Sequence, residues 1–207
     1  MIYIYGAGGH SKVVYYTFSS CEQEVVAFVD DNPHSCLCDL PVLSPEEIPD
    51  YPSCVIHFAI GKNSIRYRLQ KEWQQRGFFA KTAIHIGATI YPDVSVGAGS
   101  LVAVGSIVGP DTVIGDGCIV NHNAVIDHDN SVGEFCHIAP SATLGGGVTV
   151  GAQCLIGAGA TILPNLTVGD FVTVGAGAVV TQDVRDGVVV VGCPARPINH
   201  KKRCDEH

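Results

Sequence analysis

The chain has 207 residues, of which 46% are hydrophobic and 15% are charged, and its formal net charge is −8. This balance argues against a nucleic-acid-binding protein, and no apolar run is long enough for a membrane span. The first residues do not resemble a signal peptide, and the nine cysteines have no zinc-site or CxxC spacing, so we expect a cytoplasmic protein with reduced thiols and no metal.

Residues 1–80 alternate between apolar runs and helical stretches. Strands are predicted over Ile2–Tyr5, Val25–Val29 and Cys54–Ile60, and a helix follows both the first and the third. This alternation is typical of a small parallel sheet with flanking helices. We therefore predict a Rossmann-like α/β domain over residues 1–80.

A glycine-rich turn, from Gly6 to His10, joins the first predicted strand to its helix. The backbone N–H groups at such a helix start can receive phosphate oxygens. The acidic pair Asp30-Asp31 follows at about the distance at which these folds recognise a ribose or base. Ser11 stands where a dinucleotide fingerprint has its third glycine, which argues against an NAD site. A phosphate-binding turn and a tight turn without a ligand both remain open at this point.

From Ile84 onward, every sixth residue is aliphatic and branched. Hexapeptide repeats of this kind mark a parallel β-helix, in which three units close one triangular coil of eighteen residues. We assign residues 81–185 to this coil and residues 186–207, with the basic run Lys201 to Arg203, to a C-terminal tail. The aliphatic series is Ile84, Ile90, Val96, Val102, Val108, Ile114, Val120, Ile126, Val132, Ile138, Leu144, Val150, Ile156, Ile162, Val168, Val174 and Val180.

A second inward position follows four residues after each aliphatic one and is mostly small. Cys118, Cys136 and Cys154 occupy it at intervals of eighteen residues, so they are expected to stack inside the coil. A nucleophilic cysteine would suit acyl transfer, but buried thiols of this kind are usually inert packing groups. We therefore favour the packing role.

A polar stretch stands out in the middle of the coil. It runs from Asn121 to Asp129 and continues from Glu134 to His137. Its three histidines fall at no inward position, which excludes a core role. A carboxylate beside His128 can orient the imidazole and raise its basicity, as a general base for acyl transfer requires. One coil further on, Gly146 leaves room beside that base. A three-histidine zinc site and a solvated polar rim are the alternatives, although the histidine intervals do not fit the zinc site.

The chain resembles the sugar O-/N-acyltransferase family along nearly its whole length. The residues that carry the resemblance are Ile-Tyr-Gly-Ala-Gly-Gly-His, Val-Asp-Asp, Ala-Ile-Gly-Lys-Asn-Ser-Ile-Arg and Ile-Asp-His-Asp followed by Gly-Glu-Phe-Cys-His. This family includes sialic acid O-acetyltransferases and the acetyltransferases of bacillosamine and perosamine synthesis. The resemblance implies a left-handed parallel β-helix, a homotrimer with sites between chains, and acetyl-CoA as the donor.

The resemblance also implies roles for individual residues. The catalytic set would be His128 as general base, Asp129, Asn121 and Asp127. Acetyl-CoA would contact His137, Gly146, Ala158 and Ala176. The nucleotide-linked sugar would be held by Gly8, Gly9, His10, Asp30, Asp31, Gly61, Asn63 and Ser64.

The expected reaction is direct N-acetylation of the 4-amino group of a UDP-linked amino-dideoxy sugar of the bacillosamine type. The alternatives are O-acetylation of sialic acid and N-acetylation of another nucleotide amino sugar such as perosamine. Gly8 and Lys62 differ from the residues found in some relatives, which leaves the identity of the sugar open.

Overall fold

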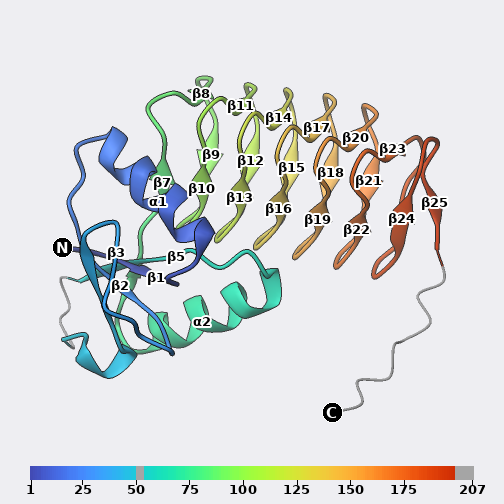
Figure 1. Cartoon of the computed structure of the whole chain (residues 1–207). Helices are drawn as coiled ribbons and strands as arrows, with labels where there is room; N and C mark the ends of the chain where they lie inside the picture. The colour runs from blue at the N-terminus through green and yellow to red at the C-terminus, as the bar shows by residue number, and fades with distance from the viewer. Residues whose placement is uncertain (50–53, 199–207) are drawn as a thin grey trace, which may run out of the picture.

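The computed structural model describes residues 1–49 and 54–198, in which a small α/β domain packs against one end of a long coil (Figure 1). The α/β sheet has the strand order β3-β4-β2-β1-β5-β6, and its neighbours are parallel except for the pair β3 and β4. The predicted Rossmann-like class is confirmed. Its elements are β1 (Ile2–Tyr5), α1 (Gly9–Ser20), β2 (Val25–Val29), β3 (Cys36–Leu37), β4 (Leu40–Leu43), η1 (Pro45–Glu47), β5 (Val55–Phe58), α2 (Asn63–Gln75) and β6 (Phe79–Ala80).

The coil is a parallel β-helix with three faces, as predicted from the hexapeptide period. From β7 to β23, strands of one face pair in parallel at a spacing of eighteen residues, for example Ile119 with His137, whereas β22 pairs with β24 at a spacing of sixteen. The first face contains β7 (Ala83–Ile84), β10 (Leu101–Val102), β13 (Ile119–Val120), β16 (His137–Ile138), β19 (Leu155–Ile156), β22 (Thr173–Val174) and β24 (Val189–Val191). The second contains β8 (Thr89–Ile90), β11 (Ile107–Val108), β14 (Val125–Ile126), β17 (Thr143–Leu144), β20 (Thr161–Ile162) and β23 (Val179–Val180). The third contains β9 (Ser95–Val96), β12 (Val113–Ile114), β15 (Ser131–Val132), β18 (Thr149–Val150) and β21 (Thr167–Val168).

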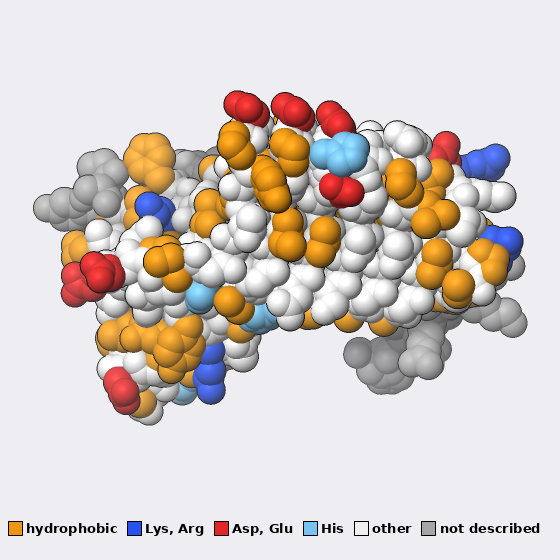
Figure 2. Space-filling view, turned by 90° about the horizontal axis from the view of Figure 1, so that it is seen from above, with side chains coloured by type: hydrophobic (Ala, Val, Ile, Leu, Met, Phe, Trp, Pro, Cys, Tyr) orange, Lys and Arg blue, Asp and Glu red, His pale blue; other side chains and the backbone are white. Residues whose placement is uncertain are grey.

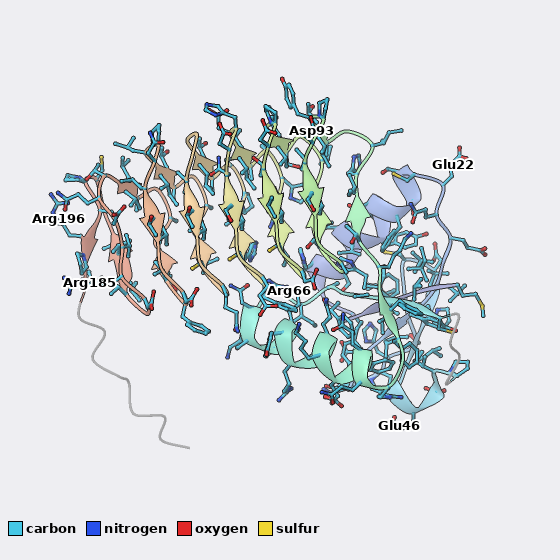
Figure 3. All side chains as sticks on the ribbon, turned by 180° about the vertical axis from the view of Figure 1, so that it is seen from behind. Glu22, Glu46, Arg66, Asp93, Arg185 and Arg196 are labelled. Carbon is cyan, nitrogen blue, oxygen red and sulfur yellow. The ribbon has the colours of Figure 1, made fainter. Side chains whose placement is uncertain are left out.

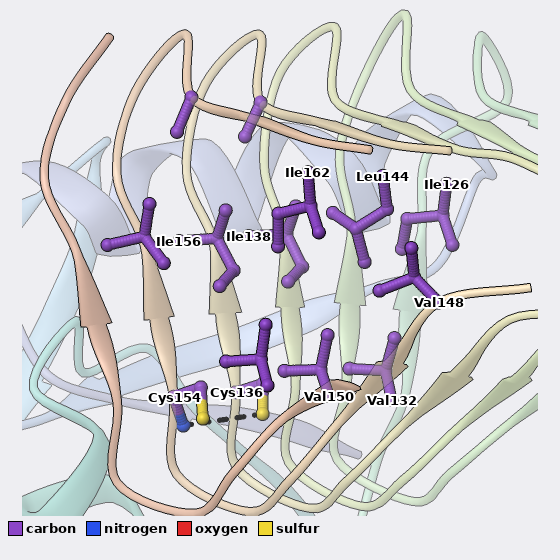
Figure 4. Close-up of a cluster of buried hydrophobic side chains, with 14 of the residues drawn as sticks. Ile126, Val132, Cys136, Ile138, Leu144, Val148, Val150, Cys154, Ile156 and Ile162 are labelled. Atoms are coloured by element: carbon purple, nitrogen blue, oxygen red, sulfur yellow. Dashed lines mark hydrogen bonds between the residues drawn. The ribbon is translucent and has the colours of Figure 1, made fainter. Parts of the chain in front are cut away.

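The aliphatic residues of the repeat fill the inside of the coil (Figure 4). From Val102 onward they are at most 2% exposed, whereas Ile84, in the first coil, is 39% exposed. The three stacked cysteines are fully buried, and the Sγ atoms of Cys136 and Cys154 each lie 2.9 Å from a backbone carbonyl oxygen of the next coil. These thiols therefore pack the interior, as predicted.

The α/β domain covers the beginning of the first face. The outward residues Ala83, Leu101 and Ile119 are at most 1% exposed because they pack against α1 and β1 residues such as Val14 and Ile4. The next outward residue of this face is His137, on β16. The edge of the docked domain therefore lies beside His137.

The coil ends in a short hairpin. Strand β24 pairs with β22 and thus extends the first face beyond residue 185, where we predicted the coil to end. It then pairs with β25 (Arg196–Pro197) in antiparallel orientation. The basic run Lys201 to Arg203 lies outside the described residues. Among the helices within the described ranges, none is long and apolar enough to cross a membrane.

Candidate active site

His128 lies on the turn that follows β14, between two carboxylates. Its Nδ1 is 2.6 Å from Oδ2 of Asp129, and its backbone N–H donates to Oδ1 of Asp127 over 2.8 Å. The hydrogen bond with Asp129 and then the charge of Asp127 raise the pKa of His128 above its usual value of 6.5. A neutral imidazole that donates from Nδ1 keeps a lone pair on Nε2. The geometry therefore suits a base that accepts a proton at Nε2.

Gly146 lies directly against this imidazole in the next coil. A Cβ atom at Gly146 would be 2.5 Å from both Cε1 and Nε2 of His128. The glycine was predicted to leave room for a thioester arm. The structure shows that part of this room is occupied by the His128 ring itself.

Asn130 supports the turn that carries His128 from inside the coil, and it was not predicted from the sequence. Its side chain is 2% exposed, and its Nδ2 lies 2.8–3.1 Å from the carbonyl oxygens of Asp127, His128 and Gly145. Thr112 Oγ1 donates to the same Asp127 carbonyl over 2.9 Å. The available signal was an amide at an inward position that is elsewhere occupied by small or apolar residues.

A surface hollow of about 300 Å³ adjoins His128, and its wall includes Tyr91, Ile107, Pro110 and Val125. Tyr91 and Ile107 are 49% and 39% exposed, respectively. Figure 2 shows a histidine beside acidic side chains on this face of the coil, next to hydrophobic groups. The surroundings of the base thus combine a polar turn with an open apolar surface.

A second group of predicted site residues surrounds His137 at the edge of the α/β domain. Nε2 of His137 is 3.1 Å from Nδ2 of Asn121, and its ring centre is 6.5 Å from that of His10. The structure therefore brings Asn121 to His137, although we had grouped it with His128. Burial lowers the pKa of His137 to about 4 and that of His10 to about 3. Both rings are neutral near pH 7.

The predicted nucleotide turn is open at its start. A Cβ atom added at Gly8 or Gly9 would meet nothing within 4 Å. Asp30 already accepts backbone hydrogen bonds, with Oδ2 2.9 Å from the N–H nitrogen of Ala7. Asp31 accepts a hydrogen bond from the Tyr5 hydroxyl. Both carboxylates thus help to shape the turn.

The loop after β5 forms one wall of a larger hollow of about 550 Å³. Gly61, from this loop, and Asn63 and Ser64, from the start of α2, line the hollow together with His137. The hollow is also lined by coil residues of the first face and of the adjoining corner, which are Gln153, Leu155, Phe171 and Thr173. The predicted sugar-binding loop and His137 therefore share one cavity.

The remaining predicted acetyl-CoA residues lie on two different corners of the coil. Ala158 and Ala176 are exposed and stack in successive coils after β19 and β22, with the Gly177 N–H donating to the Ala158 carbonyl over 2.8 Å. Gly146 lies at the corner after β17, between the second and third faces. Across the described parts of the chain, no group of three or more histidine, cysteine or acidic side chains is placed to hold a metal ion.

Both parts of the chain, the α/β domain and the hexapeptide coil, match known protein families. Residues 1–73 match the PglD N-terminal domain, and residues 131–164 and 147–182 match the bacterial transferase hexapeptide (six repeats). The comparison with curated protein sequences gives no match.

Several solved structures are similar over nearly the full chain. PerB from Caulobacter crescentus, in complex with CoA and GDP-perosamine, is 36% identical, with a TM-score of 0.91 and coverage of 96% of this chain and 97% of that one. The acetyltransferase domain of PglB from Neisseria gonorrhoeae FA1090 is 35% identical, with a TM-score of 0.90 and coverage of 95% and 98%. WeeI from Acinetobacter baumannii AYE is 28% identical, with a TM-score of 0.77 and coverage of 96% and 99%.

The α/β domain and the hexapeptide coil, together with the acetyltransferases among the similar structures, identify the chain as a hexapeptide-repeat acyltransferase. The sequence identity with PerB and with the PglB acetyltransferase domain exceeds 30% over nearly the whole chain, which assigns the protein to one family within this class. The chain belongs to the sugar O-/N-acyltransferase family.

Proposed function

We propose that the protein transfers the acetyl group of acetyl-CoA to the amino group of a nucleotide-linked amino sugar. The first candidate acceptor is the 4-amine of a UDP-linked amino-dideoxy sugar of the bacillosamine type. The observation that carries the proposal is the His128–Asp129 pair, whose Nδ1···Oδ2 distance of 2.6 Å leaves Nε2 available. The nucleotide amino sugar and CoA named for the Caulobacter relative support the substrate class.

His128 would act as the general base in a direct transfer. Its Nε2 takes a proton as the sugar amine attacks the acetyl carbon. The carbon–sulfur bond then breaks, and the departing thiolate of CoA receives a proton, so that the products are the amide and free CoA. A positioned base typically contributes a rate factor of about 10² to 10⁴.

The α/β domain would hold the nucleotide sugar. Gly8, Gly9 and His10 present the start of α1 to phosphate groups, while Asp30 and Asp31 recognise the nucleoside. Gly61, Asn63 and Ser64 line the hollow that contains His137. In this proposal the α/β domain (residues 1–80) binds the acceptor sugar. The coil (residues 81–185) binds acetyl-CoA and carries the base, and residues 186–207 form the tail.

The site would be completed by a neighbouring copy in a homotrimer. His128 lies at the corner between the second and third faces, whereas His137 and the sugar loop lie on the first face. One copy therefore contributes the base and another the sugar-binding loop. Ala158 and Ala176 would line the pantetheine of acetyl-CoA along the corner between the first and second faces. We place this reaction in the cytoplasm, where acetyl-CoA and nucleotide sugars are both available.

A thiol-release assay tests the proposal. Purified protein with acetyl-CoA is offered UDP-4-amino-4,6-dideoxy-N-acetylglucosamine, GDP-perosamine or sialic acid, beside the His128→Ala variant. Release with a nucleotide amino sugar, reduced by about 10² to 10⁴ in the variant, supports both the reaction and the base. GDP-perosamine is the second candidate because the Caulobacter structure binds it and is 36% identical. Release with sialic acid alone would replace N-acetylation by O-acetylation, and an unimpaired variant would reject His128 as the base.

A further inference from the structure

One face of α2 is joined to the coil by polar side chains. Asn63, Arg66 and Gln70 follow one another at intervals of three and four residues, which places them on the same side of a helix. Figure 3 shows Arg66 between α2 and the coil strands, and in Figure 1 α2 runs beside the coil. This side of α2 therefore faces the coil.

The three side chains donate to carbonyl oxygens in successive coils. Arg66 Nε lies 2.7 Å from the Gly117 oxygen, and Nη2 lies 3.1 Å from the Phe135 oxygen. Asn63 Nδ2 lies 3.1 Å from the Gln153 oxygen, which is again eighteen residues further along the chain. At the other end of this row, Gln70 Nε2 lies 3.2 Å from the Ala98 oxygen.

The spacing explains why a helix fits this corner of the coil. Three to four helical residues rise about 5.3 Å, and neighbouring parallel strands lie about 4.8 Å apart. Successive residues of the α2 face therefore meet successive coils. A shift of α2 by one coil would change every partner at once, so this row of contacts defines a register between the domain and the coil.

Arg66 is the central residue of this row. It is 1% exposed, and burial lowers the pKa of its guanidinium only to about 10, so the group is charged near pH 7. Its described hydrogen bonds reach five backbone carbonyls and the Asn63 side-chain amide, with no carboxylate among them. A buried charge that is stabilised only by backbone carbonyl dipoles costs more free energy than an apolar side chain packed in the same place. Arginine nevertheless suits this place because its planar group donates in several fixed directions.

The acceptors of Arg66 connect the proposed sugar-binding loop to the strand that carries His137. Nη1 donates to the carbonyl oxygen of Ile60 over 2.7 Å and contacts that of Gly61 at 3.3 Å, at the start of the loop before α2. Nη2 lies 3.3 Å from the carbonyl oxygen of Cys136, the residue directly before His137. We propose that Arg66 is a positioning residue that fixes the loop of residues 60–63 against His137. This inference rests on the proposed function for its consequence in turnover.

The test compares Arg66→Met and Arg66→Lys with Arg68→Met, an exposed residue of the same helix. Loss of a buried charged hydrogen-bonding group is expected to raise the KM for the nucleotide sugar about ten- to a hundredfold in Arg66→Met. The KM for acetyl-CoA should rise less than that for the nucleotide sugar, because Arg66 bonds directly to the sugar loop at Ile60 and Gly61 but reaches the proposed acetyl-CoA residues only through the carbonyl before His137. Arg66→Lys should recover part of the loss, since it keeps the charge but not the fork of donors.

Hydrogen–deuterium exchange provides a readout that does not need turnover. Amide exchange over residues 60–64 should become faster in Arg66→Met and stay unchanged in Arg68→Met. If Arg66→Met does not fold, Gln70→Ala should give a smaller change in the same direction for both measurements. Unchanged exchange and unchanged acceptor KM in folded variants would overturn the role of Arg66. Inactivity of the unmodified protein on every nucleotide amino sugar, combined with faster exchange in the variant, would reject the proposed function and leave the positioning role in place.

Discussion

The substitution Gly146→Ala tests the placement of the proposed general base, His128, without replacing that residue. The new Cβ would lie 2.5 Å from Cε1 and Nε2 of His128, roughly 1 Å closer than an ordinary van der Waals contact between carbon atoms. The backbone should tolerate alanine, because Ala152 and Ala158 occupy the same place in other repeats and Gly146 has no left-handed φ. The imidazole must therefore move. A displacement of about 1 Å is expected to reduce kcat about a hundredfold while the thermal stability changes little.

The assay is steady-state thiol release at saturating acetyl-CoA, with a melting curve for each variant. The matched control places Gly146→Ala in the His128→Ala background, where no imidazole is present to collide with the new methyl group. The two substitutions should then be strongly non-additive, with the double variant as slow as His128→Ala alone. A folded Gly146→Ala protein with kcat within about threefold of the unmodified protein would refute the proposed position of the base.

Three further substitutions examine the remaining titratable and nucleophilic groups. Asp129→Asn removes the main cause of the raised pKa of His128. Because the base must be neutral, the acidic limb of the pH profile of kcat should move to lower pH, and the plateau value of kcat should fall. An acidic limb that does not move would contradict the pairing of His128 with Asp129. Cys136→Ala should keep turnover within about threefold, because the thiol is fully buried and inert; a folded but inactive variant would revive covalent catalysis. His57→Phe concerns stability: burial lowers the pKa of His57 from 6.5 to about 4, so the stabilisation by the neutral ring is present above pH 6.5 and is lost as pH falls toward 4. Urea titrations should show that the unmodified protein loses about 2 kcal/mol more than this variant between pH 7 and pH 5, and equal losses would contradict the assignment.

The coil could be predicted because the six-residue period of the branched residues indicates which side chains are buried. A branched residue that recurs every sixth position must point inward in every unit, and Val102, Ile126 and Ile156 do so with no exposed surface. The short strands β3 and β4 were not predicted. They are joined by Cys38 and Asp39, whose φ angles are 48° and 63°, and neither residue has the conformational freedom that marks a turn in the sequence as glycine does.

Contacts between the domain and the coil could not be predicted from local patterns. The partners of Arg66 include Gly117 and Phe135, which lie 51 and 69 residues away along the chain. Asn121 was assigned to the pocket of His128 from the family resemblance, and within one chain the fold places it against His137. Periodicity determines which way a residue points, but it does not determine which surface of another domain will cover it.

The histidines of the proposed site lie in opposite electrostatic environments, and this difference supports different roles for them in the proposed reaction. His128 is exposed and paired with carboxylates that raise its pKa. His137 is buried, its pKa is lowered to about 4, and it has hydrogen-bonding partners at Asn121 and at the backbone of Gly61. His10, whose pKa is lowered to about 3 by burial, is also unable to hold a proton near pH 7. Environments that push pKa values apart separate acid–base groups from binding groups. In the proposed reaction, proton transfer would therefore fall to His128, while the neutral His10 and His137 would shape the cavity in which an uncharged amine meets the thioester.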